Sequence, residues 1–478
     1  MMTQSLPSYQ YLLDTSDQKL TSFAGLPLYL DMAIKSGLCA KIAENLKTRS
    51  QGWSDVQVVL SLILLNIAGG DCVDDIERLQ QDQGLSTLLL AIETDGMSRK
   101  DRRAYERRWR KNKQRAFPSA SAIRRYLEQF HHAEEERSRV EGEAFIPTNN
   151  ALLDALIEIN TTLIHFLQIQ SPCETATLDQ DATLSSTNKE SALYCYKKFK
   201  SYQPLNTYWS EQGVLIGSEF RDGNVPAGFE QLDELKKALS MLPEGVTKTP
   251  EMLKSLKSSI LKVTSRRGHT QNGLNETPIK TEQEWAEVNF VTNWASHKKS
   301  NPDYRYIAIR EKRVVQEAFD FGESVQIELP FQTIAINKNQ YKLFGIVTNR
   351  KTPGNELINW HRERCGASEK VHPVEKSELA GGQFPSQIFG ANAAWWHIMI
   401  MSFNLNVLMK QLVFPEKLKK KSLKGLRFQL ISLSAQVVSH ARGLYIKLCG
   451  GKEVFDFVIG IRKKREELTC GPGQLARG

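Results

Sequence analysis

The chain has 478 residues, of which 41% are hydrophobic and 24% charged, as expected for a globular protein. Its seven cysteines are scattered without a CxxC pair, which argues against a disulfide framework or zinc ribbon and favours a reducing cytosol. The net charge of +9 favours a polyanionic partner, and the longest apolar run, at residues 58–68, is too short to span a bilayer.

Residues 1–170 are predicted to be mostly helical. Apolar residues recur at helical intervals in 28–46 and again in 54–68. Ser54 is a suitable N-cap for the second helix, and Gly69 follows its last apolar residue. We therefore expect this region to begin with a compact helical layer.

Basic residues are concentrated in one short segment. Between Arg99 and Arg115 there are ten basic and two acidic residues, a balance of +8 that is nearly the whole excess of the chain. A shorter basic run spans 417–427, and a predicted helix at 123–130 carries two further arginines in its first turns. Such clustering indicates contact with nucleic acid. The candidate DNA-binding residues here are Arg102, Arg103, Arg107, Arg108, Arg110, Arg124 and Arg125.

After residue 174 the pattern changes to strands. Three are predicted, at 175–183, 204–209 and 214–220, and a helix is predicted at 229–242. Residues 245–283 are polar and poorly periodic. Strand patterns return at 304–310, 325–329 and 340–349, and an apolar helix with Trp395 and Trp396 in its core face is predicted at 391–413. A mixed α and β fold is therefore expected.

Acidic residues stand at the end of the first strand and on a distant helical segment. Asp179 and Asp181 alternate onto one strand face, and Glu369 lies in the polar segment 361–376. With these residues the chain resembles the DDE transposases of bacterial insertion sequences, in particular the thirteen-eighty group. The matching segments are Leu178–Thr183, Lys200–Leu205, Glu219–Asn224, Tyr341–Asn349, Arg364–His372, Lys376, Leu379–Gly382 and Asn392–Trp396.

The resemblance implies an α/β (mixed α+β) fold in which helices flank an RNase H-like mixed sheet. We expect a helical DNA-binding region at 1–170 and a DDE domain at 171–410, interrupted by a β-rich insertion at about 245–340. A basic helical region is expected at 411–478. The implied partner is double-stranded DNA, as terminal inverted repeats and target, bound by a homodimer. The implied location is the cytoplasm, at the nucleoid, with no membrane association.

The resemblance also assigns site residues. Asp181 is the implied first carboxylate, with Asp179 as the fallback, and Glu369 is the third. Asp181 and Glu369 would hold Mg²⁺ or Mn²⁺, which activates the attacking oxygen and stabilises the leaving one. Arg364 and Lys376 would contact DNA phosphates.

Two departures from the family pattern affect this expectation. The second carboxylate should follow the 229–242 helix, but no aspartate occurs between Glu234 and Pro302, and Glu251 is the one nearby substitute. Pro373 should end or kink the helix that carries Glu369. Two hypotheses follow: a transposase whose strand cleavage is impaired, and a non-catalytic remnant that binds DNA ends.

Overall fold

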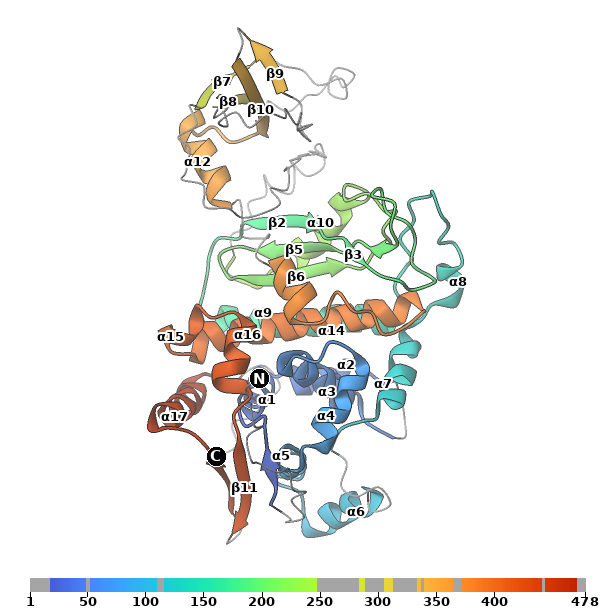
Figure 1. The fold of residues 1–478 in the computed structure, drawn as a ribbon, viewed down its shortest axis with the longest axis vertical. Helices are drawn as coiled ribbons and strands as arrows, with labels where there is room; N and C mark the ends of the chain where they lie inside the picture. Colours follow the sequence, from blue (N-terminus) through green and yellow to red (C-terminus); the bar gives the residue numbers. More distant parts are fainter. Residues whose placement is uncertain are drawn as a thin grey trace, which may run out of the picture. The chain divides into compact units, whose positions relative to one another are not determined.

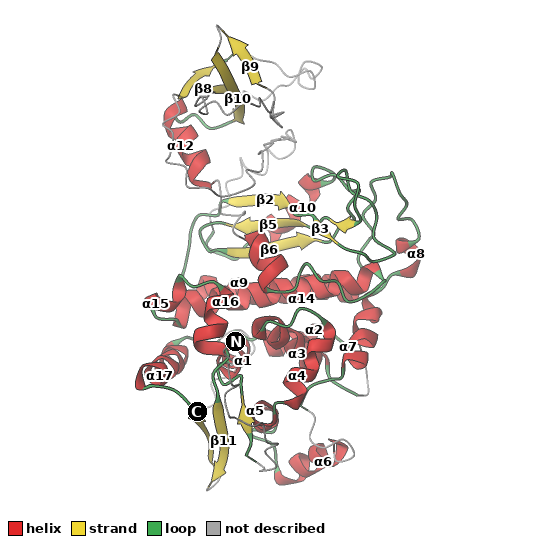
Figure 2. Cartoon of the chain, viewed as in Figure 1, coloured by secondary structure: helices red, strands yellow, loops and turns green. Residues whose placement is uncertain are grey.

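A computed structural model describes residues 18–48, 52–109, 116–246, 283–288, 305–312, 333–336, 339–364, 371–440 and 443–470. The chain divides into two compact units (Figures 1 and 2). The first comprises Met1–Phe229, Asp233–Thr247 and Ser368–Gly478, and the second comprises Glu230–Leu232 and Lys248–Ala367. Helices and strands occur together, which confirms the mixed α and β class.

Capping residues and glycines in the sequence set the bounds of the first helices. The pattern at 28–46 contains two helices, α1 (Leu26–Lys35) and α2 (Leu38–Asn45), because Gly37 between them adopts a φ of 84°. Helix α3 (Asp55–Ala68) begins with a reciprocal capping box between Ser54 and Gln57. It ends at Gly69, which has a φ of 95°. The predicted start and stop of α3 are confirmed.

Further helices complete the N-terminal part of the first unit. They are η1 (Val73–Asp75), α4 (Ile76–Gln81), α5 (Gln83–Glu93), α6 (Arg99–Trp109), α7 (Ala120–Leu127), η3 (Glu128–Phe130), α8 (Ala133–Glu136) and α9 (Ala151–Gln170). Helix α9 is long and apolar enough to cross a membrane by length and composition. However, it packs on helix α14 (Phe389–Leu408) and has a largely buried apolar face, as a core helix does.

A three-stranded antiparallel sheet lies between helices in the first unit. Its order is β2 (Leu178–Ala182), β5 (Leu205–Trp209), β6 (Val214–Glu219). A short pair, β3 (Ser185–Ser186) and β4 (Ser201–Tyr202), continues from it. Helix α14 covers one face, where the Trp396 indole donates a hydrogen bond to Ser218 Oγ at 2.8 Å. Helix α10 (Gln231–Met241) covers the other, where a Cβ on Gly217 would lie 3.1 Å from Glu234 Oε1.

Helix α14 is the central element of the core. Trp395 and Trp396 are buried, which confirms their predicted core role. A π-helical turn, η6 (Met409–Val413), extends α14. The buried amide of Asn404 donates to Asn160 on α9 at 2.8 Å and to the Leu215 carbonyl on β6 at 2.8 Å. These bonds join α9, α14 and the sheet into one core.

The C-terminal part is not wholly helical. It contains α15 (Glu416–Lys419), α16 (Leu423–Leu426), η7 (Arg427–Ile431), β11 (Ala435–His440), β12 (Gly443–Leu448) and α17 (Lys452–Glu467). The hairpin β11–β12 was not expected in 411–478. Strand β1 (Leu20–Thr21) pairs with β11, with Leu20 opposite Gln436, so distant parts of the sequence share this sheet.

The second unit has its own sheet and small core. Its strands are β7 (Gln283–Glu287), β8 (Arg305–Lys312), β9 (Thr333–Ile336) and β10 (Asn339–Thr348), in the order β7-β8-β10-β9. Helix α12 (Gly354–Arg364) follows, and its Leu357 and Ile358 pack with Ile307 and Ile309 of β8. The predicted strand at 325–329 lies outside the described residues.

Candidate active site

Asp181 and Asp179 lie on the same face of strand β2 but differ in accessibility. The Asp181 side chain is 49% exposed, whereas Asp179 is only 7% exposed. Cross-strand pairing places Asp181 opposite Asn206 on β5 and Asn206 opposite Ser218 on β6. Residues paired in this way point to the same face, here the face covered by α14. Of the two acids, Asp181 is therefore the one that presents a carboxylate to an incoming ligand.

His372 lies between two carboxylates. Its Nε2 is 3.1 Å from Asp181 Oδ2, and its Nδ1 is 3.2 Å from Glu375 Oε2. Burial lowers the pKa of His372, but hydrogen bonds to Asp181 and Glu375 and the charges of both carboxylates outweigh burial and raise it to about 9. Both ring nitrogens therefore donate at neutral pH, and the imidazolium joins the strand to the helical segment.

Glu375 is a fully buried carboxylate at this site. Besides His372, it accepts a hydrogen bond from Asn206 Nδ2 at 2.7 Å, and Asn206 Oδ1 in turn accepts from Ser218 Oγ at 2.6 Å. A buried polar group is costly unless it has such hydrogen-bond partners. This chain of contacts fixes His372, and with it Asp181, against the sheet.

Lys376 lies next to these groups and is held by the backbone. Its Nζ donates to the Leu184 carbonyl at 2.7 Å, just beyond the end of β2. Burial lowers its pKa, while the charges of Glu375 and Asp181 raise it in part. The α-helical geometry ends at Pro373, and a π-helical turn, η5 (Val374–Glu378), follows. The proline lacks the N–H that a continuing α-helix would use.

The structure does not describe the side chains of three further candidate residues, Glu369, Glu251 and Arg364. Glu369 and Glu251 lie outside the described residues. Arg364 is the last residue of α12 in the second unit, and its side chain is not described. In the part of the chain that the structure describes, no group of three or more histidine, cysteine or acidic side chains is arranged to hold a metal ion.

A second acidic group lies on the opposite face of the sheet. Glu219 follows Ser218 on β6, so alternation directs its side chain toward α10, where Glu234 is buried. Burial, reinforced by the charge of Glu219, raises the pKa of Glu234 to about 7. Glu219 is paired with Arg221, whose Nε donates to Glu219 Oε2 at 2.7 Å. Because these acids face away from Asp181, they do not complete its site.

Residues 99–109 of the predicted basic segment form helix α6, and Tyr105 attaches this helix to the rest of the first unit. Tyr105 on α6 accepts a hydrogen bond from Gln57 Nε2 at 2.8 Å and donates to Glu93. Arg102 and Arg103 are exposed on this anchored helix. Arg107 and Arg108 belong to α6 but their side chains are not described, and Arg110 lies outside the described residues.

The two arginines of α7 differ in their partners. Arg124 forms an ion pair with Asp74. Arg125 is exposed, and its Nε donates to the Ser121 carbonyl of its own helix at 3.2 Å. Arg125 is therefore freer than Arg124 to meet an external anion.

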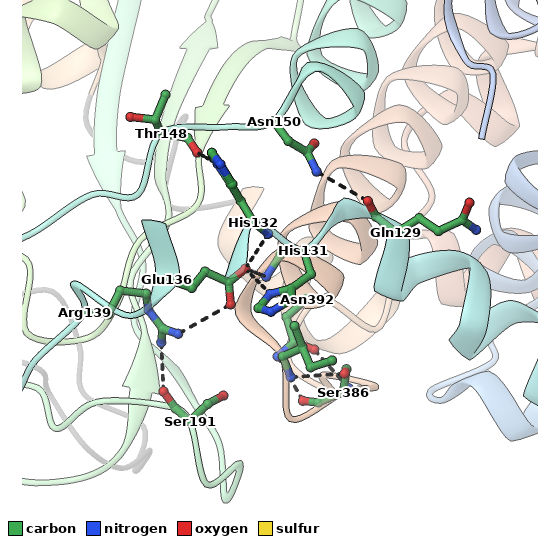
Figure 3. A network of polar contacts seen from close by, with 12 residues as sticks. Gln129, His131, His132, Glu136, Arg139, Thr148, Asn150, Ser191, Ser386 and Asn392 are labelled. Atoms are coloured by element: carbon green, nitrogen blue, oxygen red, sulfur yellow. Dashed lines mark hydrogen bonds and ion pairs between the residues drawn. The ribbon is translucent and has the colours of Figure 1, made fainter. Parts of the chain in front are cut away.

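A polar network fixes the segment between α8 and α9 to the sheet side of the unit (Figure 3). Arg139 donates from Nε and Nη2 to the carboxylate of Asp222, at 2.6 and 2.8 Å, and from Nη2 to the Ser191 carbonyl at 2.8 Å. Its guanidinium also lies over the Phe389 ring, 4.2 Å from the centroid. Glu136 accepts from the Gly390 N–H at 2.8 Å. The network ties the loop before β4 to the start of α14.

Glu375 and Asn206 were not predicted from the sequence as members of the site. The spacing of His372 and Glu375 by three residues could have suggested a helical pair. Asn206 gave no signal, because its role depends on the strand register.

The chain matches a known protein family. A family model described as "Transposase DDE domain group 1" matches residues 8–255 and 331–459. The unmatched stretch, 256–330, lies within the insertion expected at about 245–340 and overlaps the polar, poorly periodic segment 245–283. No curated protein matches this chain.

Proposed function

This chain belongs to the transposase DDE domain family, group 1, and from that premise we propose that it acts on the ends of an insertion sequence. The substrate would be double-stranded DNA with terminal inverted repeats, bound by a homodimer at the nucleoid. The observation that carries the proposal is the accessible Asp181 carboxylate at the end of β2, beside Lys376. An accessible acid next to a lysine suits a phosphodiester and its metal.

Asp181 and Glu369 are the proposed ligands of Mg²⁺ or Mn²⁺. Carboxylate oxygens are the donors that these cations prefer, and Asp181 exposes one such group. When bound, the cation supplies Lewis-acid activation for phosphoryl transfer. His372 orients Asp181, and Glu375 with Asn206 orients His372. Lys376 and Arg364 would contact DNA phosphates.

Helix α6 is the proposed duplex-binding surface, with Arg125 on α7 as a further contact. Replacing the arginines of α6 by alanine should weaken duplex binding and flatten its dependence on salt by about 0.9 per lost phosphate contact. Fluorescence anisotropy across a salt series measures both effects. The variant would carry Ala at Arg102, Arg103, Arg107 and Arg108. Unchanged affinity and slope would refute a DNA role for α6.

We further propose that this copy cleaves DNA poorly. The motivating observation is that no aspartate occurs between Glu234 and Pro302, where the family's second carboxylate belongs. With one ligand missing, the cation would be held loosely and the phosphate charge incompletely neutralised. The alternative is a remnant that binds ends without any cleavage.

Nicking of an end-bearing supercoiled plasmid in Mg²⁺ tests this proposal. We expect binding with little or no nicking. Robust nicking that Asp181→Asn abolishes would overturn the proposal of impaired cleavage but support the proposal that the chain is a transposase. Nicking that persists in Asp181→Asn would come from a contaminant and would leave impairment standing. Absence of any end binding would contradict the proposed function itself.

A further inference from the structure

A tight hairpin follows the candidate site along the chain. Cys195 N donates to the Phe199 carbonyl at 2.9 Å, and Lys198 N donates to the Cys195 carbonyl at 2.9 Å. Lys198 has a φ of 63°, so the three residues between Cys195 and Phe199 form a turn that ends in the left-handed region. We call Tyr196, Lys197 and Lys198 the hairpin tip.

The hairpin tip and the residues just behind it combine exposed aromatic rings with ammonium groups. Tyr196 is 74% exposed, although a tyrosine ring ordinarily gains from burial. Lys197 Nζ lies 5.6 Å from the centroid of the Tyr196 ring. Just behind the tip, Tyr194 is also exposed, with Lys200 Nζ 5.9 Å from its ring centroid. The free faces of two aromatic rings are thus presented together with positive charge.

Strand pairing connects this hairpin to Asp181. The ladder that pairs Asp181 with Asn206 continues through the Thr183 N–H to Pro204 and the Thr187 N–H to Lys200. Lys376 Nζ donates a hydrogen bond to the carbonyl of Leu184, which lies within this ladder. Burial lowers the pKa of Lys376 most, and the charge of Lys197 lowers it further, so the two ammonium groups are near enough to repel. The tip and the candidate site are therefore connected by one strand ladder.

The base of the hairpin is held firmly. Arg139 binds the Ser191 carbonyl at 2.8 Å, and the Tyr194 N–H donates to Glu141 at 3.2 Å (Figure 3 shows the first of these contacts). Lys200 Nζ donates to the Glu190 carbonyl at 2.8 Å. Because the base is fixed, the exposed tip loses little conformational freedom when it contacts a ligand.

We infer that the hairpin tip binds unpaired nucleotides of the DNA strand next to Asp181, with Tyr196 stacking on a base and Lys197 and Lys198 meeting its phosphates. This inference rests on the proposed function and adds a substrate feature to it. In a duplex the faces of the bases are stacked on neighbouring bases. An aromatic side chain can therefore stack on a base only where nucleotides are unpaired. Aromatic residues interleaved with lysines are the composition that suits single strands.

The test uses the full chain with two probes, a short fluorescein-labelled oligothymidine and a blunt duplex of mixed sequence. Tyr196→Ala should weaken oligothymidine binding by about 5- to 150-fold, the range expected for loss of one stacked base. Its duplex affinity should change by less than about twofold. Tyr196→Phe keeps the ring and should bind as the unmodified chain does.

Phe428→Ala is the matched control, because Phe428 is 87% exposed beside the basic run 417–427 but distant in sequence from the tip. It should leave oligothymidine binding unchanged. Lys197→Gln combined with Lys198→Asn should reduce the salt dependence of oligothymidine binding by about 0.7 per lost phosphate contact. Asn is chosen because it tolerates the positive φ of position 198.

The outcomes separate the inference from the proposed function. Equal oligothymidine affinity in Tyr196→Ala and the unmodified chain would overturn the inference. It would also be overturned if Phe428→Ala lost as much oligothymidine affinity as Tyr196→Ala. Duplex binding that persists in those cases would leave the proposed function intact. If the unmodified chain binds neither probe, both proposals fail.

Discussion

Replacing Glu234 by glutamine tests whether the buried acid on α10 limits stability. Glu234 is 4% exposed and lies near Glu219, and Lys237 Nζ is 3.8 Å from its carboxylate. Burial, with the charge of Glu219, raises its pKa from 4.5 to about 7. Glutamine keeps the shape of the side chain and removes the charge.

The sign follows from proton linkage. Below pH 4.5 the carboxyl is protonated in both folded and unfolded chains, so its burial carries no ionisation penalty. Between pH 4.5 and about 7 the unfolded chain ionises first, and the folded state loses stability as the pH rises. Above this window the penalty is constant at about 3 kcal/mol, from 1.36 kcal/mol for each pH unit of the shift.

Urea unfolding followed by tryptophan fluorescence at several pH values measures this penalty. Glu234→Gln should be more stable than the unmodified chain at about pH 8, by up to about 3 kcal/mol, and this gain should shrink as the pH falls and vanish below pH 4.5. Asp233→Asn is the control, because it removes the same charge from an exposed neighbour and should change stability little. A gain that does not depend on pH, or a loss at about pH 8, would refute the reasoning.

Three further substitutions test individual contacts of the first unit. Asp222→Asn should destabilise the first unit by about 3–5 kcal/mol, because it removes the closer of the two carboxylates that pair with the buried Arg139 guanidinium. Urea midpoints would reveal this, and partial recovery on adding Arg139→Met would identify the unpaired charge as the cause. Glu375→Ala should lower the free energy of unfolding by about 1–3 kcal/mol, because it leaves the buried Asn206 amide without its hydrogen-bond acceptor. An unchanged thermal midpoint would contradict this. Ser54→Ala should cost about 1 kcal/mol through loss of the α3 cap, measured by circular dichroism, and no change would refute the capping argument.

The sequence predicted those elements whose bounds are set by residues close to them in the chain. Ser54, Gln57 and Gly69 lie within or beside the helix that they start and stop, so their chemistry alone sets its bounds. Gly213 lies between the predicted strands at 204–209 and 214–220 and has a φ of 65°, which glycine adopts readily in a tight turn. In both cases the residues that decide the backbone lie within a few positions of it.

Prediction failed where partners are distant in sequence. Asn206 and Glu375 are 169 residues apart, and their contact depends on strand register and on a π-helical turn after Pro373. The hairpin β11–β12 was missed because its pairing with Leu20 supplies a neighbour that the C-terminal sequence does not reveal. Tertiary contacts, rather than local preference, decided these elements.

The late position of α14 in the chain has a consequence for incomplete copies of the gene. The first helices depend on α14: Tyr29 donates to Asn406 at 2.8 Å, and Asn66 donates to Ser402 at 3.3 Å. A ribosome that stops before residue 389 therefore releases helices α1, α3 and α9 with their apolar faces unpaired. Such a product is open to aggregation and proteolysis. Nonsense mutations across the first four-fifths of the gene should thus yield no persistent DNA-binding fragment that competes with intact protein.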